Sequence, residues 1–230
     1  MSDERFSGDE QAHYARHFLV KGFGPEGQAR LKAGKVLVVG AGGLGCPALM
    51  YLAAAGVGHI GIVEDDTVDV SNLHRQLLFG VGDIGAPKGA VARQKLLDNN
   101  PHIDIRHFAE RLSQSNVLAY VQGYDVIVDA TDNFTTKYLL NDACYLGGKP
   151  LVYASISQFE GQVGVFNLTD AEGRRSTNCA ISSLNHPRPA WRKIAARPVC
   201  WVCCRGLSAR SRRWRRSRSW PEWASRRPTA

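Results

Sequence analysis

The sequence lacks several features that would assign it to a class at once. No run approaches the roughly 18 to 20 apolar residues of a membrane-spanning helix, and residues 1–30 lack the apolar core of a secretory signal. We therefore expect a cytoplasmic protein with no membrane partner. Without a secretion signal, the six cysteines do not indicate a framework of structural disulfides. With 44% hydrophobic and 22% charged residues, the 230-residue chain resembles an ordinary globular protein.

Tryptophan is missing from residues 1–170, and acidic residues and glycine are scarce in residues 171–230. All five Trp lie in those last 60 residues, whereas only two of the 23 Gly do. Residues 1–170 hold 14 Lys and Arg against 19 Asp and Glu, and residues 171–230 hold 15 against 2. The formal net charge of +8 therefore belongs to the C-terminal segment alone. This difference divides the chain into residues 1–172, predicted to be one domain, and an anomalous segment, 173–230.

Apolar, β-branched runs alternate with helix-like segments through the first of these parts. Such alternation predicts an α/β fold with a doubly wound, mostly parallel sheet of the Rossmann type. Residues 10–32 are typical of an N-terminal helical segment, broken at 22–27. The predicted strands are 35–39, 59–64, 103–108, 125–129, 151–155 and 162–166, and the predicted helices are 46–55, 86–99, 113–121 and 134–146.

A glycine-rich turn stands between the first predicted strand and its helix. The sequence from Gly40 to Gly45 fits the pattern G-x-G-x-x-G, in which Gly40 and Gly42 let the backbone approach a phosphate at the helix N-terminus. Glu64 lies 24 residues beyond Gly40, at the end of the second strand. A carboxylate there can accept hydrogen bonds from ribose hydroxyls. Together these features predict an adenine-nucleotide site.

The residues that follow bear on which nucleotide binds. Ser71, predicted as a helix N-cap, precedes Asn72, Arg75 and Gln76, and Lys88 begins the next helix. Taken singly, such cations are more often solvated surface charges. Two cations near one turn nevertheless suit a triphosphate, because arginine offers a two-pronged fork and lysine a mobile point charge. A nicotinamide-dependent oxidoreductase on the same fold remains the alternative.

Asp132 follows the strand 125–129 at the carboxyl edge of the predicted sheet. Carboxylate oxygens are ligands that Mg²⁺ prefers, so Asp132 is a candidate metal ligand. The alternative role is that of N-cap for the helix 134–146, and one side chain can serve in both.

The ordered motifs together resemble the ThiF/MoeB/HesA adenylyltransferases, which are bacterial relatives of the ubiquitin-activating enzymes. The resemblance covers about residues 14–168, far more than a nucleotide fingerprint. It is carried by Arg16-His17, Gly27-Gln28, Leu31-Lys32, Val36 through Gly45, Asp66-Thr67-Val68, Ser71-Asn72-Leu73, Arg75-Gln76, Lys88 and Asp129 through Asn133.

This resemblance implies an enzyme that uses ATP and Mg²⁺ to adenylylate the C-terminal glycine of a small β-grasp sulfur-carrier protein ending in Gly-Gly, with release of pyrophosphate. The molybdopterin and thiamine pathways both remain open. The resemblance also implies a homodimer, in which Arg16 reaches the triphosphate bound by the neighbouring subunit. It assigns the ribose to Glu64, Mg²⁺ to Asp132, catalysis to Arg16, Arg75, Lys88 and Asp132, and further nucleotide contacts to Gly40, Gly42, Ser71, Asn72, Gln76 and Asn133.

Two positions depart from the family pattern. Glu64 stands where the family more often has Asp, and His13 stands where many relatives have Arg.

Residues 173–230 do not continue the family pattern, which often includes two C-x-x-C zinc pairs. Arg with interleaved Trp would suit an RNA-binding arm, and Cys200 with Cys203 is a single, weak zinc motif. Shifting the reading frame by one base permits family-like sequence over 177–190 and 197–209. We therefore interpret the segment as frameshifted and expect it to be disordered, with no zinc site or nucleic-acid partner. Such a product is expected to fold poorly or to lack activity.

Overall fold

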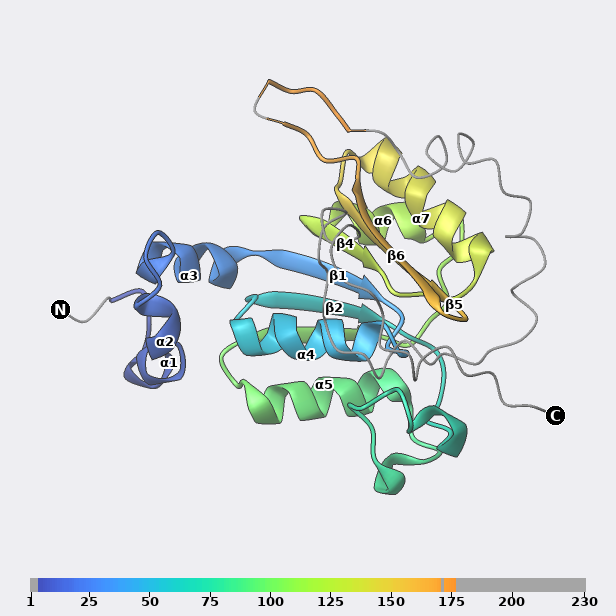
Figure 1. Ribbon diagram of the computed structural model, residues 1–230, viewed down its shortest axis with the longest axis horizontal. Helices are drawn as coiled ribbons and strands as arrows, with labels where there is room; N and C mark the ends of the chain where they lie inside the picture. Colours follow the sequence, from blue (N-terminus) through green and yellow to red (C-terminus); the bar gives the residue numbers. More distant parts are fainter. Residues whose placement is uncertain (1–3, 171, 177–230) are drawn as a thin grey trace, which may run out of the picture.

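The computed structural model describes residues 4–170 and 172–176, and one six-stranded sheet organises them (Figure 1). The strand order is β3-β2-β1-β4-β5-β6. The first five strands in this order pair in parallel, and β6 pairs antiparallel to β5. The strands are β1 (Lys35–Val39), β2 (His59–Val63), β3 (Asp104–Phe108), β4 (Val126–Asp129), β5 (Leu151–Ser157) and β6 (Glu160–Phe166).

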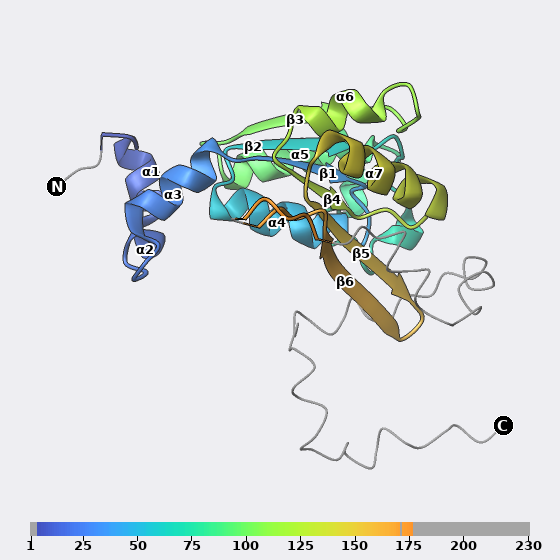
Figure 2. The same cartoon turned by 90° about the horizontal axis from the view of Figure 1, so that it is seen from above.

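Helices cover both faces of the sheet (Figures 1 and 2). Helices α4 (Gly45–Ala55) and α5 (Lys88–Asn99) pack on one face, and α6 (Val117–Gln122) and α7 (Phe134–Gly147) pack on the other. Strand β1 serves both cores, because its side chains alternate between the faces. A strand buried on both sides explains the unbroken apolar run that the sequence has there.

Three short helices precede the sheet and lie beyond the amino end of β1 (Figures 1 and 2). They are α1 (Gly8–His13), α2 (Ala15–Phe18) and α3 (Gly24–Ala33). Buried polar contacts attach them to the rest: Asn100 donates to the Tyr14 hydroxyl at 2.7 Å, and Gln28 donates to the Ala55 carbonyl at 3.0 Å. Because both amides are fully buried, these bonds hold the N-terminal helices in a fixed place.

The predicted α/β fold is confirmed, and the elements differ from the prediction mainly at their ends. The break predicted at 22–27 is shorter, since α3 begins at Gly24 and includes Gly27, where a Cβ would lie 2.4 Å from the Phe23 ring. The helix predicted from residue 113 begins at Val117, because the Asn116 side chain accepts from the Ser113 amide and holds a turn there. Two 3₁₀ helices, η1 (Val70–Asn72) and η2 (Val81–Asp83), fill the link between β2 and α5.

Within the described residues, no helix combines the length and the apolar character needed to cross a membrane. The C-terminal segment predicted to be disordered begins at residue 173. Its first residues, 173–176, instead pair back on the chain, with Arg175 bridging to Thr169 and the Ser176 amide donating to the Leu168 carbonyl at 2.8 Å. The rest of the segment, with the Cys200–Cys203 motif, lies outside the described residues.

Candidate functional site

A cavity of about 490 Å³ lies where β1, β2, β4 and β5 end. These are carboxyl ends of parallel strands, and the chain leaves β1 and β4 toward opposite faces of the sheet. Such a switch point is where open α/β sheets bind their ligands. The cavity has the size of a small-molecule site. Nine of the predicted site residues line it, namely Gly40, Gly42, Glu64, Asn72, Arg75, Gln76, Lys88, Asp132 and Asn133.

The glycines of the loop between β1 and α4 serve different purposes. A Cβ at Gly45 would lie 1.9 Å from the Gly40 carbonyl oxygen, and Gly40 itself has a φ of +92°. Packing and backbone conformation therefore require both residues to be glycine. At Gly42 the nearest atom to an added Cβ is Gln76 Nε2, at 3.7 Å. Gly42 thus leaves open space on the cavity side, where a ligand can meet the backbone.

Glu64 joins the end of β2 to this glycine loop. Its carboxylate accepts hydrogen bonds from the Ala41 amide at 2.7 Å and from the Asp66 amide at 3.0 Å. Two carboxylate oxygens offer about four lone-pair sites. The side chain therefore keeps the capacity to accept bonds from ligand hydroxyls in the cavity that it lines.

Lys88 brings a buried positive charge to the cavity. It is the first residue of α5 and only 4% exposed, and its ammonium group pairs with the Asp66 carboxylate. The hydrogen bond from Lys88 holds the pKa of Asp66 below its usual value. Asp66 is itself 63% exposed, so a ligand that enters can share the ammonium group with it.

The η1 helix and the turn that follows it place two side-chain amides and one cation on the cavity wall. The Asn72 Oδ1 and Gln76 Oε1 atoms are buried and have no hydrogen-bond partner, although buried polar groups are almost always bonded. The guanidinium of Arg75 is held by the Ser71 carbonyl at 3.0 Å. Unsatisfied amides beside a held cation indicate that a polar ligand completes this wall.

Two predicted roles are corrected by the structure. Ser71 is not an N-cap, since Asp69 caps η1 and takes both the amide and the hydroxyl of Ser71; Ser71 lies outside the cavity lining and supports Arg75 instead. The N-cap of α7 is Asn133, which accepts from the Thr136 amide at 2.8 Å, and not Asp132. Asp132 is therefore left free, exposed to the cavity without a hydrogen bond or ion pair to another described residue.

The metal role of Asp132 stays a prediction. Among residues 4–170 and 172–176 there is no group of three or more His, Cys, Asp or Glu side chains that could hold a metal ion by itself. Mg²⁺ in nucleotide sites is usually held by one or two carboxylates together with phosphate oxygens and water. A single unpaired carboxylate such as Asp132 fits a site of that kind.

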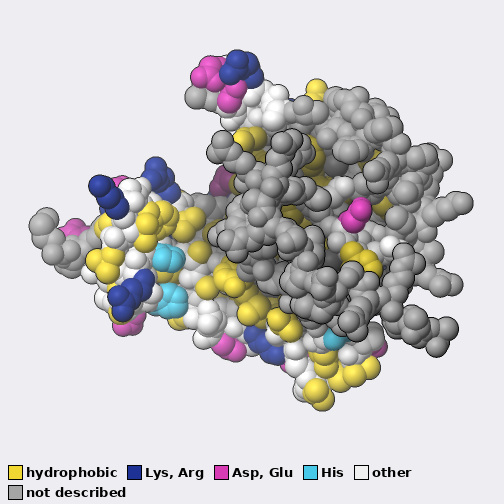
Figure 3. Space-filling model, in the orientation of Figure 1, with side chains coloured by type: hydrophobic (Ala, Val, Ile, Leu, Met, Phe, Trp, Pro, Cys, Tyr) yellow, Lys and Arg dark blue, Asp and Glu magenta, His cyan; other side chains and the backbone are white. Residues whose placement is uncertain are grey.

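Arg16, like Ser71, lies outside the cavity lining, and the structure places it much farther away. It is exposed on α2, at the opposite end of the sheet from the cavity of its own chain (Figure 2). Cationic and histidine side chains gather over these N-terminal helices (Figure 3). The position is compatible with a role in a neighbouring subunit, which stays a prediction.

The cavity also contains residues that the sequence reasoning missed. Arg111, after β3, pairs with Asp65 at 3.3 Å, and both line the cavity, as do Ser155 and Ser157 at the end of β5. The predicted topology indicated that residues after β3 and β5 belong to the site, because these strands end at the same edge of the sheet as β1, β2 and β4.

Comparison with protein families gives a match to the ThiF family model over residues 14–203. Among curated proteins, the chain is 52% identical over 163 residues to a sulfur carrier protein adenylyltransferase of Thermus thermophilus, covering 71% of this chain and 60% of the relative. It is 53% identical over 160 residues to a probable adenylyltransferase/sulfurtransferase MoeZ of Mycobacterium tuberculosis, covering 70% and 41%. The chain thus spans 60% or less of the length of these relatives.

Solved structures give the same picture of the fold. Escherichia coli tRNA N6-threonylcarbamoyladenosine dehydratase TcdA in complex with ATP superposes with a TM-score of 0.62 at 26% identity, over 69% of this chain and 64% of that one. Escherichia coli MccB with AMPCPP and MccA gives a TM-score of 0.60 at 29% identity, over 68% of this chain and 47% of that one.

The two classes of loop glycine predict different defects. Gly42→Ala should fold normally but bind ATP at least about tenfold more weakly, because the new methyl group occupies ligand space. Gly45→Ala should lower the melting temperature, since its Cβ collides with the Gly40 carbonyl. Calorimetric ATP titration and thermal melting check both variants. Equal defects in the two would contradict separate roles for these glycines.

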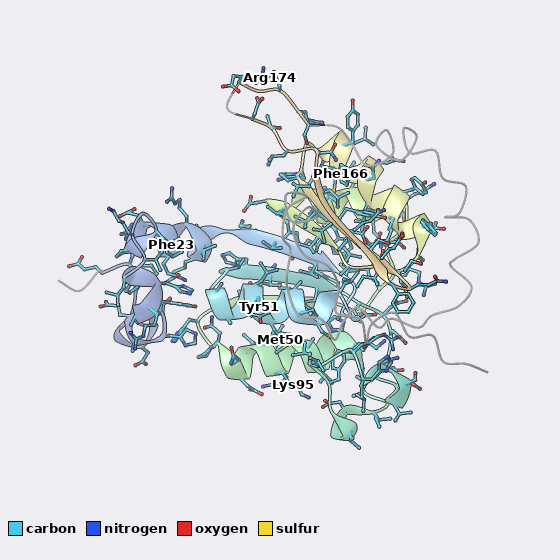
Figure 4. All side chains as sticks on the ribbon, viewed as in Figure 1. Phe23, Met50, Tyr51, Lys95, Phe166 and Arg174 are labelled. Atoms are coloured by element: carbon cyan, nitrogen blue, oxygen red, sulfur yellow. The ribbon has the colours of Figure 1, made fainter. Side chains whose placement is uncertain are left out.

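Lys88 can be tested against a matched lysine on the same helix. Lys95, labelled beside α5 in Figure 4, also pairs with an aspartate, Asp83, but is not part of the cavity lining. Lys88→Met should weaken ATP binding about 10- to 100-fold, because this is the loss in affinity expected when one or more hydrogen bonds to a charged group are removed. Lys95→Met should leave the affinity unchanged. The role given to Lys88 is wrong if both variants lose the same affinity in direct titration.

Proposed function

Because the chain belongs to the ThiF family, we propose that it is an ATP-dependent adenylyltransferase that activates a small sulfur-carrier protein. The acceptor is the C-terminal glycine carboxylate of the carrier, and pyrophosphate is released. One observation carries this proposal: the buried ammonium group of Lys88, the held guanidinium of Arg75 and the free carboxylate of Asp132 surround a single cavity at the glycine loop.

The geometry suits the transfer of an adenylyl group by positioning and charge. The carrier carboxylate attacks the α-phosphorus in line with the departing pyrophosphate, so the enzyme itself needs no nucleophile. Burial raises the pKa of the Cys46 thiol to about 11 and that of Cys144 to about 12. Neither thiol lines the cavity, which favours a mechanism without an enzyme-bound intermediate in the described residues.

Each side chain has a role in this mechanism. Glu64 accepts from the ribose hydroxyls, while Asn72 and Gln76 bind the nucleotide through their buried amides. Arg75 and Lys88 stabilise the charge that develops on the phosphate oxygens. Mg²⁺ bound with the nucleotide would neutralise part of the phosphate charge, with Asp132 as its protein ligand.

The active unit in this proposal is a homodimer. Helix α2, which carries Arg16, lies beyond the amino end of β1 (Figures 1 and 2), whereas the cavity lies at the carboxyl ends of the strands. Arg16 can therefore contact a nucleotide only in another copy. A second copy would bring one more cation to the triphosphate.

Sulfur-carrier activation is favoured over the nicotinamide alternative. Glu64 and the glycine loop would serve either nucleotide, but Arg75 and Lys88 suit a triphosphate. The names of the 52% and 53% identical relatives point to adenylyl transfer, and the first of them names a sulfur carrier.

Isotope exchange between ATP and pyrophosphate tests this function. We expect any exchange to require Mg²⁺ and a carrier ending in Gly-Gly, with carriers of the molybdopterin and thiamine types assayed in parallel. Carrier-dependent exchange by the 230-residue chain would overturn the expectation that this product folds poorly or lacks activity. Asp132→Asn should lower the exchange rate roughly 100-fold, whereas Asp142→Asn, an exposed aspartate on α7 outside the cavity, should not. Absence of exchange with every carrier, together with tight NAD binding, would instead support an oxidoreductase.

We also propose that residues 1–172 carry this activity and that 173–230 are read in a shifted frame. The family match itself runs on to residue 203, into the segment assigned to the shift. Sequencing the gene across codons 165–230 and beyond should reveal a one-base change that restores Gly- and Leu-rich family sequence. An unaltered frame with nothing family-like downstream would refute the shift and make nucleic-acid binding by the basic segment the better account.

A further inference from the structure

A buried ion pair lies directly behind the residues that line the cavity. Lys137 on α7 is 6% exposed and Asp129 at the end of β4 is 0% exposed, with 3.1 Å between Nζ and Oδ2. The same ammonium group donates to the Ala154 carbonyl of β5 at 2.7 Å. It also lies 4.5 Å from the centre of the Tyr153 ring. One side chain therefore connects α7 with the end of β4 and the middle of the neighbouring strand β5.

The contacts of Lys137 with Asp129 and with Ala154 lead to different walls of the cavity. The second oxygen of Asp129 accepts from the Thr131 amide at 3.0 Å and from the Thr131 hydroxyl at 2.7 Å. These bonds fix the turn on which the next residue, Asp132, stands. On the other side, Ala154 directly precedes Ser155, which lines the cavity. The ammonium group thus fixes the Asp132 turn relative to β5.

Stability alone does not account for such an arrangement. Removing two charges from water is costly, and apolar residues of similar volume often stabilise a protein as well as a buried ion pair does. What a satisfied buried network adds is a single defined geometry. Metal ligands in particular depend on partners that orient them, and the loss of such partners typically weakens metal binding by 10- to 100-fold.

We propose that Lys137 is a positioning residue for the Mg²⁺–nucleotide complex. Through Asp129 and Thr131 it sets the place of the Asp132 carboxylate, and through the Ala154 carbonyl it sets the opposite wall at β5. Lys137 does not touch the ligand. The inference rests on the proposed function, because it takes the ligand to be ATP with Mg²⁺.

The test removes the network without leaving a buried charge. In the double variant Asp129→Asn/Lys137→Met, the new amide oxygen can still accept from Thr131, but the link to β5 is lost. ATP is titrated calorimetrically with and without Mg²⁺. We expect an unchanged affinity without Mg²⁺ and a loss of about 10- to 100-fold in the enhancement that Mg²⁺ gives the wild-type chain. Lys137→Arg, which keeps a donor for both acceptors, should restore most of that enhancement.

A control separates positioning from general stability. Lys32→Met removes the ion pair with Glu10, whose side chain is 9% exposed, at the far end of the sheet. It should lower the melting temperature but keep the full Mg²⁺ enhancement. Should the double variant fail to fold, Thr131→Val removes the hydroxyl contact to Asp129 and should lower the enhancement by about tenfold. Because Thr131 itself lines the cavity, its affinity for ATP without Mg²⁺ is measured too and should stay unchanged.

The outcomes distinguish this inference from the function on which it rests. Full Mg²⁺ enhancement in the double variant, or in Thr131→Val if the double variant does not fold, would overturn the role of Lys137 and leave the proposed function intact. Absence of ATP binding by the wild-type chain would overturn both.

Discussion

The approach of Gly45 to the Gly40 carbonyl is the constraint on which the site depends. An added Cβ there would lie only 1.9 Å from the carbonyl oxygen, so α4 can start this close to β1 only because residue 45 has no side chain. The first turn of α4 is thereby held at the carboxyl end of the central strand. The positive dipole end of α4 therefore lies beside the cavity, which Gly43 and Leu44 of the preceding turn line. Glu64 also holds this loop at the end of β2, because its carboxylate accepts a hydrogen bond from the Ala41 amide.

The charges around the cavity explain why the ligand would enter together with a cation. The described lining holds more acids than bases, with Glu64, Asp65, Asp66, Glu110 and Asp132 against Arg75, Lys88 and Arg111. Three of the acids are occupied: Asp66 by Lys88, Asp65 by Arg111, and Glu110 by Asn116 and Tyr120. A triphosphate alone would add negative charge to a wall that is already acidic. In the proposed function, a divalent ion or an arginine from another subunit would offset that repulsion.

Sequence reasoning reached the fold and most of the cavity because both depend on local patterns. Alternating apolar runs predicted the sheet, and residues at strand ends share one edge by topology, so Gly42, Glu64, Arg75 and Lys88 could be grouped in advance. The caps were wrong by one or two residues, with Asp69 and Asn133 in place of Ser71 and Asp132. The N-cap is the last residue with an extended backbone before a helix begins, and tertiary packing determines which residue that is.

The Lys137–Asp129 pair and the Arg111–Asp65 pair link separate elements, and single-sequence periodicity carries no signal for such contacts.

The connection from β2 to α5 is closed at its base. The Lys88 amide donates to the Asp66 carbonyl at 2.9 Å while its ammonium group binds the carboxylate of the same residue, and Thr67 bridges to Pro87 just above. The segment between them, which contains η1 and η2, is therefore a long connection whose two ends are joined. Extending such a loop costs little chain entropy. Insertions near the exposed residues Leu77 and Val81 should therefore be tolerated, because they would lengthen the connection while leaving its closed base beside the cavity unchanged.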